Sequence, residues 1–266
     1  MAVSTLASAP STLSDSEMIF RNIIFSAVLV GLVSGLIYGV FQQTQLSPII
    51  YAAEKFEANK STQVSLHENN IDSLNPHTET AWSPSNGAER IFWTLLANVL
   101  TGISFALVML SLMAIHNLKS NKPKVDSIQG IGWGAVALLA IFVAPALIGL
   151  HPEVPGTVAI GLEHRQGWWL FCVLATALGA AVLYYTPIKF KALGVMLAVI
   201  PHIIAAPIHA QLIFENTDPV AVAHLNDLSQ QFFSMTAIGT ALFFIVLGAS
   251  SGFAVKKFIH LNAQAI

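Results

Sequence analysis

The sequence predicts an all-α, polytopic helical membrane protein, and its composition is the first reason. Only 10% of the 266 residues are charged, whereas a soluble domain carries about 25%. Hydrophobic residues make up 55% of the chain, and the mean hydropathy is +0.67. Twelve Lys and Arg and 14 Asp and Glu cannot cover a soluble globule of this size. This excludes a soluble enzyme, and the single cysteine and net charge of −2 exclude a disulfide-rich secreted domain and a nucleic-acid-binding protein.

The second reason is that the charges are clustered and leave long stretches without Asp, Glu, Lys or Arg. A transmembrane helix needs about 20 apolar residues to cross about 30 Å of hydrocarbon. Six stretches meet this requirement, so we predict a single transmembrane domain over residues 21–260. Its six spans are expected at residues 23–41, 91–115, 131–150, 167–186, 192–214 and 232–255.

The segments outside the spans differ in character. Residues 1–20 are rich in Ser, Thr and Ala and lack the features of a signal peptide, so they are predicted to form a disordered cytoplasmic tail. Residues 42–90 form the one long connection, a polar outer loop. It is expected either to cap the outer face or to be disordered, and the sequence does not decide between these alternatives.

The third reason is an asymmetry of basic residues, which also predicts the orientation. Lys and Arg are enriched in cytoplasmic loops. Eight basic residues lie on the side that would hold both termini, and four lie on the other side. The eight are Arg21, Lys119, Lys122, Lys124, Lys189, Lys191, Lys256 and Lys257, and the four are Lys55, Lys60, Arg90 and Arg165. Both termini are therefore predicted to be cytoplasmic, and the outer surface, which carries most of the acids, is predicted to be acidic.

Glycine and proline mark features of the spans. Gly31, Gly35 and Gly39 recur every four residues in the first span, as do Gly248 and Gly252 in the last. Small residues at this interval let helices approach closely in lipid, so these are interpreted as packing faces. The third span contains Pro145, and the fifth contains Pro201 and Pro207. Because proline interrupts helical hydrogen bonding, the fifth span is expected to be irregular and to line a cavity or be buried.

The spans contain no carboxylate or amine, which excludes an intramembrane proton relay of Asp or Glu. The chain has no phosphate-binding Gly-rich loop and no common hydrolase motif, so it is predicted not to be an enzyme. Histidine remains. His202 and His209 are seven residues apart, which would place them on one helix face about 10 Å apart. Two imidazoles so arranged fit a path for a divalent metal ion, and two hydrogen-bonded structural histidines are an equally good interpretation.

The loop at residues 151–166 is the second candidate site. It carries His151, Glu153, Glu163 and His164 within fourteen residues, a mixture of nitrogen and oxygen donors that would suit Co²⁺, Ni²⁺ or Zn²⁺. The spacing matches no standard zinc motif, and an ordinary solvated loop is the alternative. Trp168 and Trp169 follow directly and are interpreted as anchors at the membrane interface.

Several segments in this order resemble the CbtA family of predicted cobalt transporter subunits. They are Gln42-Gln43, Gly87-Ala88-Glu89-Arg90, residues 96–102, Ala144-Pro145-Ala146, Pro152-Glu153-Val154-Pro155-Gly156, residues 165–169 and residues 201–207. The resemblance implies a protein of the bacterial inner membrane that acts with a small single-span, His-containing subunit, CbtB. It also implies cobalt as the transported ion.

Together these observations favour a membrane subunit for uptake of a divalent metal, most simply Co²⁺. The metal would meet the candidate ligands His151, Glu153, Glu163 and His164 outside and then His209 and His202. No prosthetic group is expected, and the expected partners are membrane lipid, the metal ion and the CbtB-like subunit, with no nucleic acid. The alternatives are a carrier of nickel or zinc, an assembly or regulatory membrane protein without transport activity, and a haem-bearing redox subunit.

Overall fold

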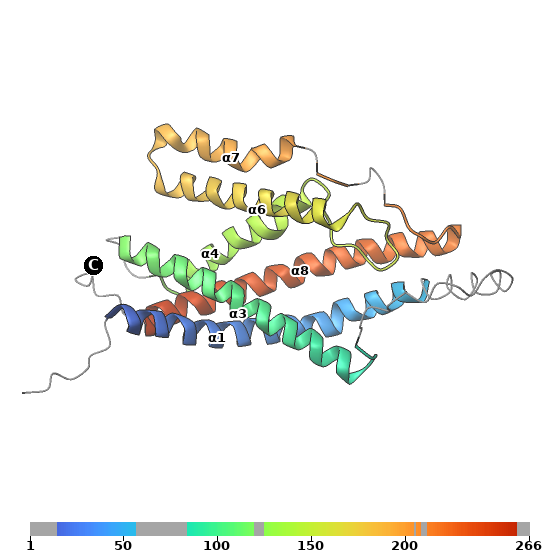
Figure 1. The fold of residues 1–266 in the computed structure, drawn as a ribbon, viewed down its shortest axis with the longest axis horizontal. Coiled ribbons are helices and arrows are strands. Elements are labelled where there is room, and N and C mark those ends of the chain that lie inside the picture. Colours follow the sequence, from blue (N-terminus) through green and yellow to red (C-terminus); the bar gives the residue numbers. More distant parts are fainter. Residues whose placement is uncertain (1–14, 57–83, 120–124, 205, 209–211, 260–266) are drawn as a thin grey trace, which may run out of the picture.

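The computed structural model describes residues 15–56, 84–119, 125–204, 206–208 and 212–259, and within them it confirms a helical membrane protein (Figure 1). Five helices are long and apolar enough to cross a membrane. They are Glu17–Phe56, Ala88–Lys119, Ser127–Ala146, Leu162–Tyr185 and Pro219–Phe258. Large apolar side chains remain exposed along most of these helices, as expected for surfaces that face lipid.

Several of these helices are interrupted. Helix α1 (Asp15–Phe41) passes through a π-helical turn, η1 (Gln42–Leu46), and continues as helix to Phe56. Helix α4 (Ser127–Leu138) passes through a second π-helical turn, η2 (Leu139–Val143), into the short α5 (Ala144–Ala146). The remaining elements are α3 (Ala88–Lys119), α6 (Leu162–Tyr185), the 3₁₀ turn η3 (Ile188–Phe190), α7 (Lys191–Ile203) and α8 (Pro219–Phe258).

Aspartate side chains define where two helices begin. The Asp126 carboxylate accepts the backbone N–H groups of Ile128 and Gln129 at 3.1 and 3.0 Å at the start of α4. Asp218 accepts the N–H of Ala221 at 3.0 Å at the start of α8, where Pro219 occupies the first helical position. These side chains satisfy N–H groups that have no partner within the helix.

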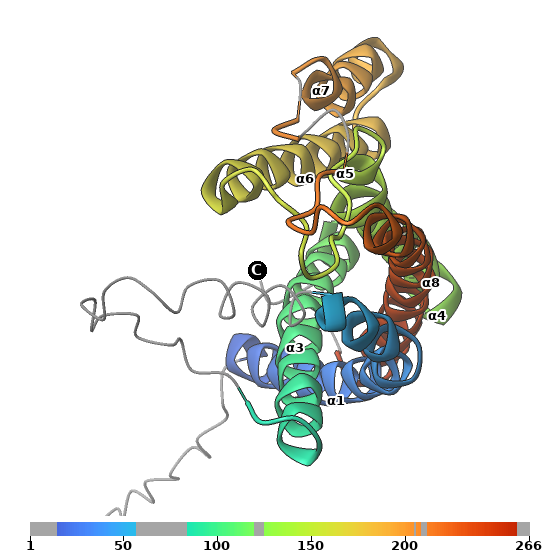
Figure 2. The same cartoon turned by 90° about the vertical axis from the view of Figure 1, so that its right-hand side faces the viewer.

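Helices α1, α3 and α8 pack against one another, and α4 packs on α8 (Figures 1 and 2). Their shared core includes Ala27, Leu110, Met113, Phe244 and Leu247. Helices α6 and α7 form a hairpin on the far side of α4, and α6 contacts η2 and α5. The hairpin is also joined to α3, where His116 Nδ1 lies 2.8 Å from the Tyr185 hydroxyl.

Glycines make the closest helix crossings, which confirms the interpretation of the spaced glycines as packing faces. A Cβ at Gly35 would lie 2.6 Å from the carbonyl oxygen of Asn98 on α3. On α8, a Cβ at Gly248 or Gly252 would overlap the backbone of α4. Only glycine lets these backbones lie in contact.

Three predicted boundaries differ from the structure. The first helix begins at Asp15, within the predicted tail, and extends through residues 42–56, which were predicted as loop. Pro48 has no N–H to donate, and the helix continues past it because the π-helical turn directly before accommodates the missing hydrogen bond. Gln42 of this segment also accepts a hydrogen bond from Asn98 on α3. The predicted span at residues 192–214 is helical only as α7, which ends at Ile203, so six spans are not confirmed.

Residues 1–14 and 57–83 lie outside the described residues, as does His209. Among the basic residues assigned to the cytoplasmic side, those at helix ends gather at one end of the bundle. There α1 begins, α3 and α8 end, and α6 connects to α7 (Figure 1). This arrangement agrees with the grouping of these residues on one side, while the direction in which that side faces stays a prediction.

Candidate functional site

Helix α4 is interrupted by a π-helical turn followed by a proline. The Ala144 N–H donates to the Leu139 carbonyl, the longer hydrogen bond of a π turn. Pro145 comes next and has no N–H, so the Ile141 carbonyl, four residues earlier, loses its α-helical donor. The same arrangement occurs in the first helix, where the Ser47 N–H donates to the Gln42 carbonyl and Pro48 follows. Single π turns of this kind are frequent at functional sites.

Two adjacent tryptophans of α6 hold the interrupted segments. Trp169 Nε1 donates to the Ile141 carbonyl at 3.0 Å and so replaces the donor that Pro145 lacks. Trp168 Nε1 donates to the carbonyl of Ile204, the residue directly after α7, at 3.2 Å. Trp168 is buried, with 8% of its surface exposed. The interpretation of Trp168 as an interfacial anchor is therefore wrong, because its indole bridges α6 to the end of α7.

The ends of α5 and α7 are brought to the same region by this pair. Ala144 and Trp168 pack with Cys172, and Leu150 and Ala206 cover this small apolar cluster. The carboxyl-terminal end of a helix has carbonyl groups without helical donors and carries a partial negative charge. Two such ends, α5 at Ala146 and α7 at Ile203, form an environment that favours a cation over an anion.

Each of these helix ends carries a predicted histidine. His151 Nε2 lies 3.1 Å from the carbonyl oxygen of Ala146, the last residue of α5, and the ring contacts Phe233 at a centroid distance of 4.4 Å. His202 is half-buried in the last turn of α7. The continuous helix expected from His202 to His209 is absent, because α7 ends at Ile203 and the backbone of Ile204 is extended. His209 itself lies outside the described residues.

The segment after His151 is ordered by contacts with the end of the first helix and the start of α8. Val154 is buried with Ile49 and Ala53 of the first helix and with Leu225 of α8. Backbone hydrogen bonds of 2.8 and 2.9 Å join residues 156–158 to residues 213–215. Gly156 has a φ of 81°, a conformation that glycine adopts readily. The Pro- and Gly-containing loop is thus a defined structure.

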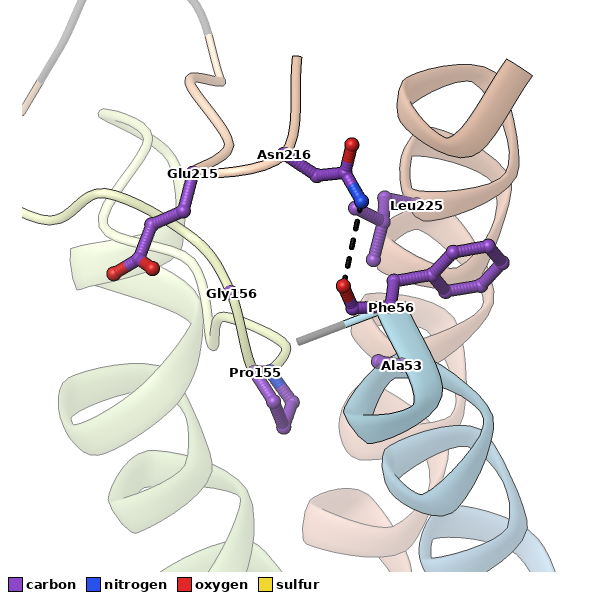
Figure 3. Close-up of a pocket in the computed structure, with 7 residues that line it drawn as sticks. All are labelled: Ala53, Phe56, Pro155, Gly156, Glu215, Asn216 and Leu225. Atoms are coloured by element: carbon purple, nitrogen blue, oxygen red, sulfur yellow. Dashed lines mark hydrogen bonds between the residues drawn. The ribbon is translucent and has the colours of Figure 1, made fainter. Parts of the chain in front are cut away.

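Below these contacts lies a small cavity, lined by residues that include Ala53, Pro155 and Glu215 (Figure 3). Asn216 Nδ2 donates to the Phe56 carbonyl across it at 3.3 Å. Its volume is about 10 Å³, room for about one water molecule. It is therefore a packing feature of the end of the bundle where the first helix ends and α8 begins.

The remaining predicted ligands are not gathered into a preformed metal centre. Glu153 forms an ion pair with Arg165, with Nη1 and Oε2 2.8 Å apart. Glu163 and His164 are exposed in the first turn of α6. Among the residues that the structure describes, no three His, Cys, Asp or Glu side chains are grouped closely enough to hold a metal ion.

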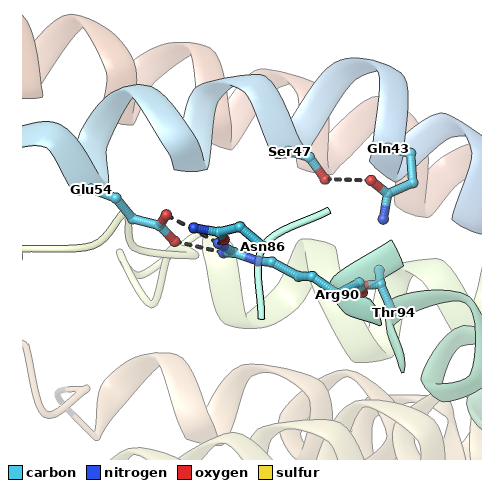
Figure 4. Close-up of polar contacts among 6 residues, drawn as sticks. All are labelled: Gln43, Ser47, Glu54, Asn86, Arg90 and Thr94. Carbon is cyan, nitrogen blue, oxygen red and sulfur yellow. Dashed lines mark hydrogen bonds and ion pairs between the residues drawn. The ribbon is translucent and has the colours of Figure 1, made fainter. Parts of the chain in front are cut away.

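Polar contacts between the first helix and α3 were not anticipated as part of a site (Figure 4). Arg90 Nη1 donates to Glu54 Oε2 and to Asn86 Oδ1, both at 3.1 Å, and its guanidinium lies 4.6 Å from the centroid of the Tyr51 ring. Deeper in the bundle, Asn98 Nδ2 donates to Gln42 Oε1 at 2.6 Å. The signal available in the sequence was that Gln42, Arg90 and Asn98 lie in segments that carry the family resemblance.

A comparison with family models gives the same family. Residues 20–256 match the model described as probable cobalt transporter subunit (CbtA). The chain belongs to the CbtA family. The match covers almost the whole extent of the five long helices of this CbtA-family protein, including both π-helical turns. No curated protein and no solved structure matches the chain. Family and fold together make it a multi-pass membrane protein of a family of probable transporter subunits.

The guanidinium of Arg90 is expected to stabilise this CbtA-family protein in a way that lysine cannot reproduce. Arg90→Lys keeps the charge and loses the two-pronged contact with Glu54. Because both side chains are partly exposed, we expect a loss of only about 1 kcal/mol, measured by thermal unfolding in detergent. Lys55→Gln, beside Glu54 on the exposed surface, is the control. Equal unfolding temperatures for Arg90→Lys and the wild type would contradict this role.

Proposed function

We propose that this protein is the membrane subunit of a divalent metal uptake transporter of the bacterial inner membrane, with Co²⁺ as the ion and a small single-span, His-containing CbtB-like subunit as partner. Membership of a family of probable cobalt transporter subunits supports the class of substrate. The protein has no catalytic role in this proposal, and the metal is cargo.

The observation that carries the proposal is the convergence of two helix ends, each with an imidazole. The carboxyl-terminal ends of helices and irregular backbone inside a membrane protein serve as cation sites in transporters. His151 at α5 and His202 at α7 add nitrogen donors, which cobalt, nickel and zinc accept. His202 lies on α7 and His151 follows α5, and α6 bonds to the backbone next to α7 through Trp168 and to the turn before α5 through Trp169.

The metal path in this proposal starts at the outer surface. Glu163 and His164 are exposed there, and Glu153 lies beside them in its ion pair with Arg165. An arriving dication competes with the guanidinium for the Glu153 carboxylate, so loading of this station requires Arg165 to move aside. The ion then passes His151 and reaches His209 and His202.

The membrane potential suffices to drive this movement in the proposed inward direction. Moving one elementary charge across 100 mV is worth about 2.3 kcal/mol, so a dication gains about 4.6 kcal/mol. At about 1.4 kcal/mol for each factor of ten, this corresponds to a concentration ratio of a few thousand. Uptake would therefore need no nucleotide site on this chain.

We expect His151→Ala and His202→Ala each to reduce cobalt uptake at least tenfold, because each removes an imidazole from one helix end. The measurement is accumulation of radioactive cobalt in proteoliposomes under an imposed potential, with and without the small subunit, and with nickel and zinc as competitors. His209→Ala tests, in the same assay, the step between the outer ligands and His202.

His224→Ala is the matched control, since His224 is exposed at the outer end of α8 and stacks on Phe56. Uptake that is unchanged in His151→Ala, His202→Ala and His209→Ala would disprove the histidine path. Wild-type protein that moves no metal even with its partner present would instead support an assembly or regulatory role.

A further inference from the structure

A groove lies on the surface between α1 and α8, near the end of the bundle where α1 begins and α8 ends. Its volume is about 490 Å³, within the range of about 300–1,000 Å³ that is typical of small-molecule sites. Leu29 and Val33 line it on α1, and Ala249, Phe253 and Phe258 line it on α8. Its walls are therefore mainly apolar, and the small side chain of Ala249 leaves room for an occupant.

The end of this groove is basic. Lys257 Nζ lies 5.3 Å from the centroid of the Phe253 ring and 5.5 Å from that of the Phe258 ring, and both rings line the groove. Lys256 is exposed beside it. Asn22 Nδ2 donates to the Phe258 carbonyl at 3.0 Å, which fixes the end of α8 against the start of α1.

Asp126, next to a lining residue of the groove, already has hydrogen-bond partners. Asp126 precedes Ser127, which contributes to the lining, but its carboxylate accepts two backbone N–H groups at the start of α4. Lys256 and Lys257 therefore bring two positive charges to this end of the groove. A ligand that matches both parts of the site has an apolar chain and an anionic head.

We propose that this groove binds one anionic phospholipid, with an acyl chain between α1 and α8 and the phosphate at Lys256 and Lys257. In hydrocarbon, a groove of this size is filled either by a lipid chain or by another helix. The cation–π contacts place Lys257 at the end of the apolar walls, where a headgroup would lie. Basic pockets between transmembrane helices bind anionic headgroups in the same manner.

The test is lipid binding by the purified full-length protein, measured by native mass spectrometry with phosphatidylglycerol and phosphatidylcholine as probes. The wild type is expected to retain about one phosphatidylglycerol in preference to phosphatidylcholine. The double variant Lys256→Gln/Lys257→Gln is expected to bind phosphatidylglycerol roughly thirtyfold more weakly, from about fivefold for each lysine. Lys189→Gln/Lys191→Gln, at the same end of the bundle but on η3 and α7, is the control with unchanged binding.

Two further variants, Ala249→Phe and Ser250→Cys, test the groove itself. Ala249→Phe fills the groove and is expected to abolish retention of the lipid. If the Ala249→Phe variant does not fold, the lysine variants still test the proposal. The proposal is overturned if the wild type shows no preference for phosphatidylglycerol or if the control pair loses as much binding as Lys256→Gln/Lys257→Gln. Efficient cross-linking of two chains through Ser250→Cys, a residue of the groove, would also overturn it, because a second copy would then be the occupant.

Discussion

Gly130→Ala and Gly134→Ala are expected to prevent this protein from folding stably, whereas Gly132→Ala on the same helix is expected to stabilise it. A Cβ at Gly130 would overlap the Gly248 carbonyl, and a Cβ at Gly134 would overlap the Phe244 carbonyl, both on α8. Gly132 is exposed, and a Cβ there would meet no atom within 4 Å. The three glycines therefore share a helix and a substitution and differ only in what the added methyl group contacts.

The expected effects follow from the atoms that would have to move. Overpacking costs about 1–3 kcal/mol when side chains can adjust. Here the obstacle is backbone, so α4 and α8 must separate along their whole contact, and each variant is expected at or above the upper end of that range. Gly132→Ala gains up to about 1 kcal/mol from the higher helix propensity of alanine. Lipid contact could reduce this gain without changing its sign.

Thermal unfolding and the yield of monodisperse protein in detergent measure both effects. The packing interpretation fails if Gly130→Ala and Gly132→Ala unfold at the same temperature. Gly248→Ala is the reciprocal variant on α8, where the added Cβ would overlap the Gly130 carbonyl, and it should resemble Gly130→Ala.

Charge-free length predicted most of the fold because it reflects a requirement that every spanning helix must meet. Its failure at residues 192–214 has a local cause. That stretch is apolar enough to span a membrane, but a proline disfavours helical geometry at the residue before it. Pro207 places this restriction on Ala206, shortly after the point where α7 ends. Hydropathy counts the apolar residues of this segment and does not register the interruption. The inference that His202 and His209 share a face depended on that continuity.

The opposite error, at residues 42–56, arose because polarity was interpreted as exposure. Gln42 and Glu54 belong to a helix whose polar side chains bond to Asn98 and Arg90 on α3. Pairing between segments about 40 to 60 residues apart cannot be derived from either segment alone. The candidate site shows the same limit. The sequence predicted His151 and His202 as metal ligands from their side-chain chemistry, but it did not predict the helix ends that lie beside them.

The hydrogen bond from Trp169 to Ile141 gives a second prediction, which concerns the interruption in α4. Trp169→Phe keeps an aromatic ring in place and removes the indole N–H, so the Ile141 carbonyl loses its donor. A buried carbonyl without a partner costs about 1–3 kcal/mol. We expect a loss of this size in the free energy of unfolding.

Pro145→Ala should compensate for that loss, because alanine at this position has an N–H four residues after Ile141. The double variant Trp169→Phe/Pro145→Ala is therefore expected to be more stable than Trp169→Phe alone. The coupling energy of the double-mutant cycle should be at least about 1 kcal/mol. Trp168→Phe, which affects the Ile204 carbonyl instead, should show no such coupling with Pro145→Ala.

The four proteins of this cycle, the wild type, the two single variants and the double variant, also distinguish an effect on stability from an effect on transport. If the π-helical turn of α4 serves the proposed cation path, Pro145→Ala and the double variant should fold well and still take up less cobalt. Regular α-helical hydrogen bonding through residue 145 would shift the α5 end from its place beside His151. Additive effects on stability would show that Trp169 and Pro145 act independently. Full uptake by a stably folded Pro145→Ala protein would show that the interruption matters for packing alone.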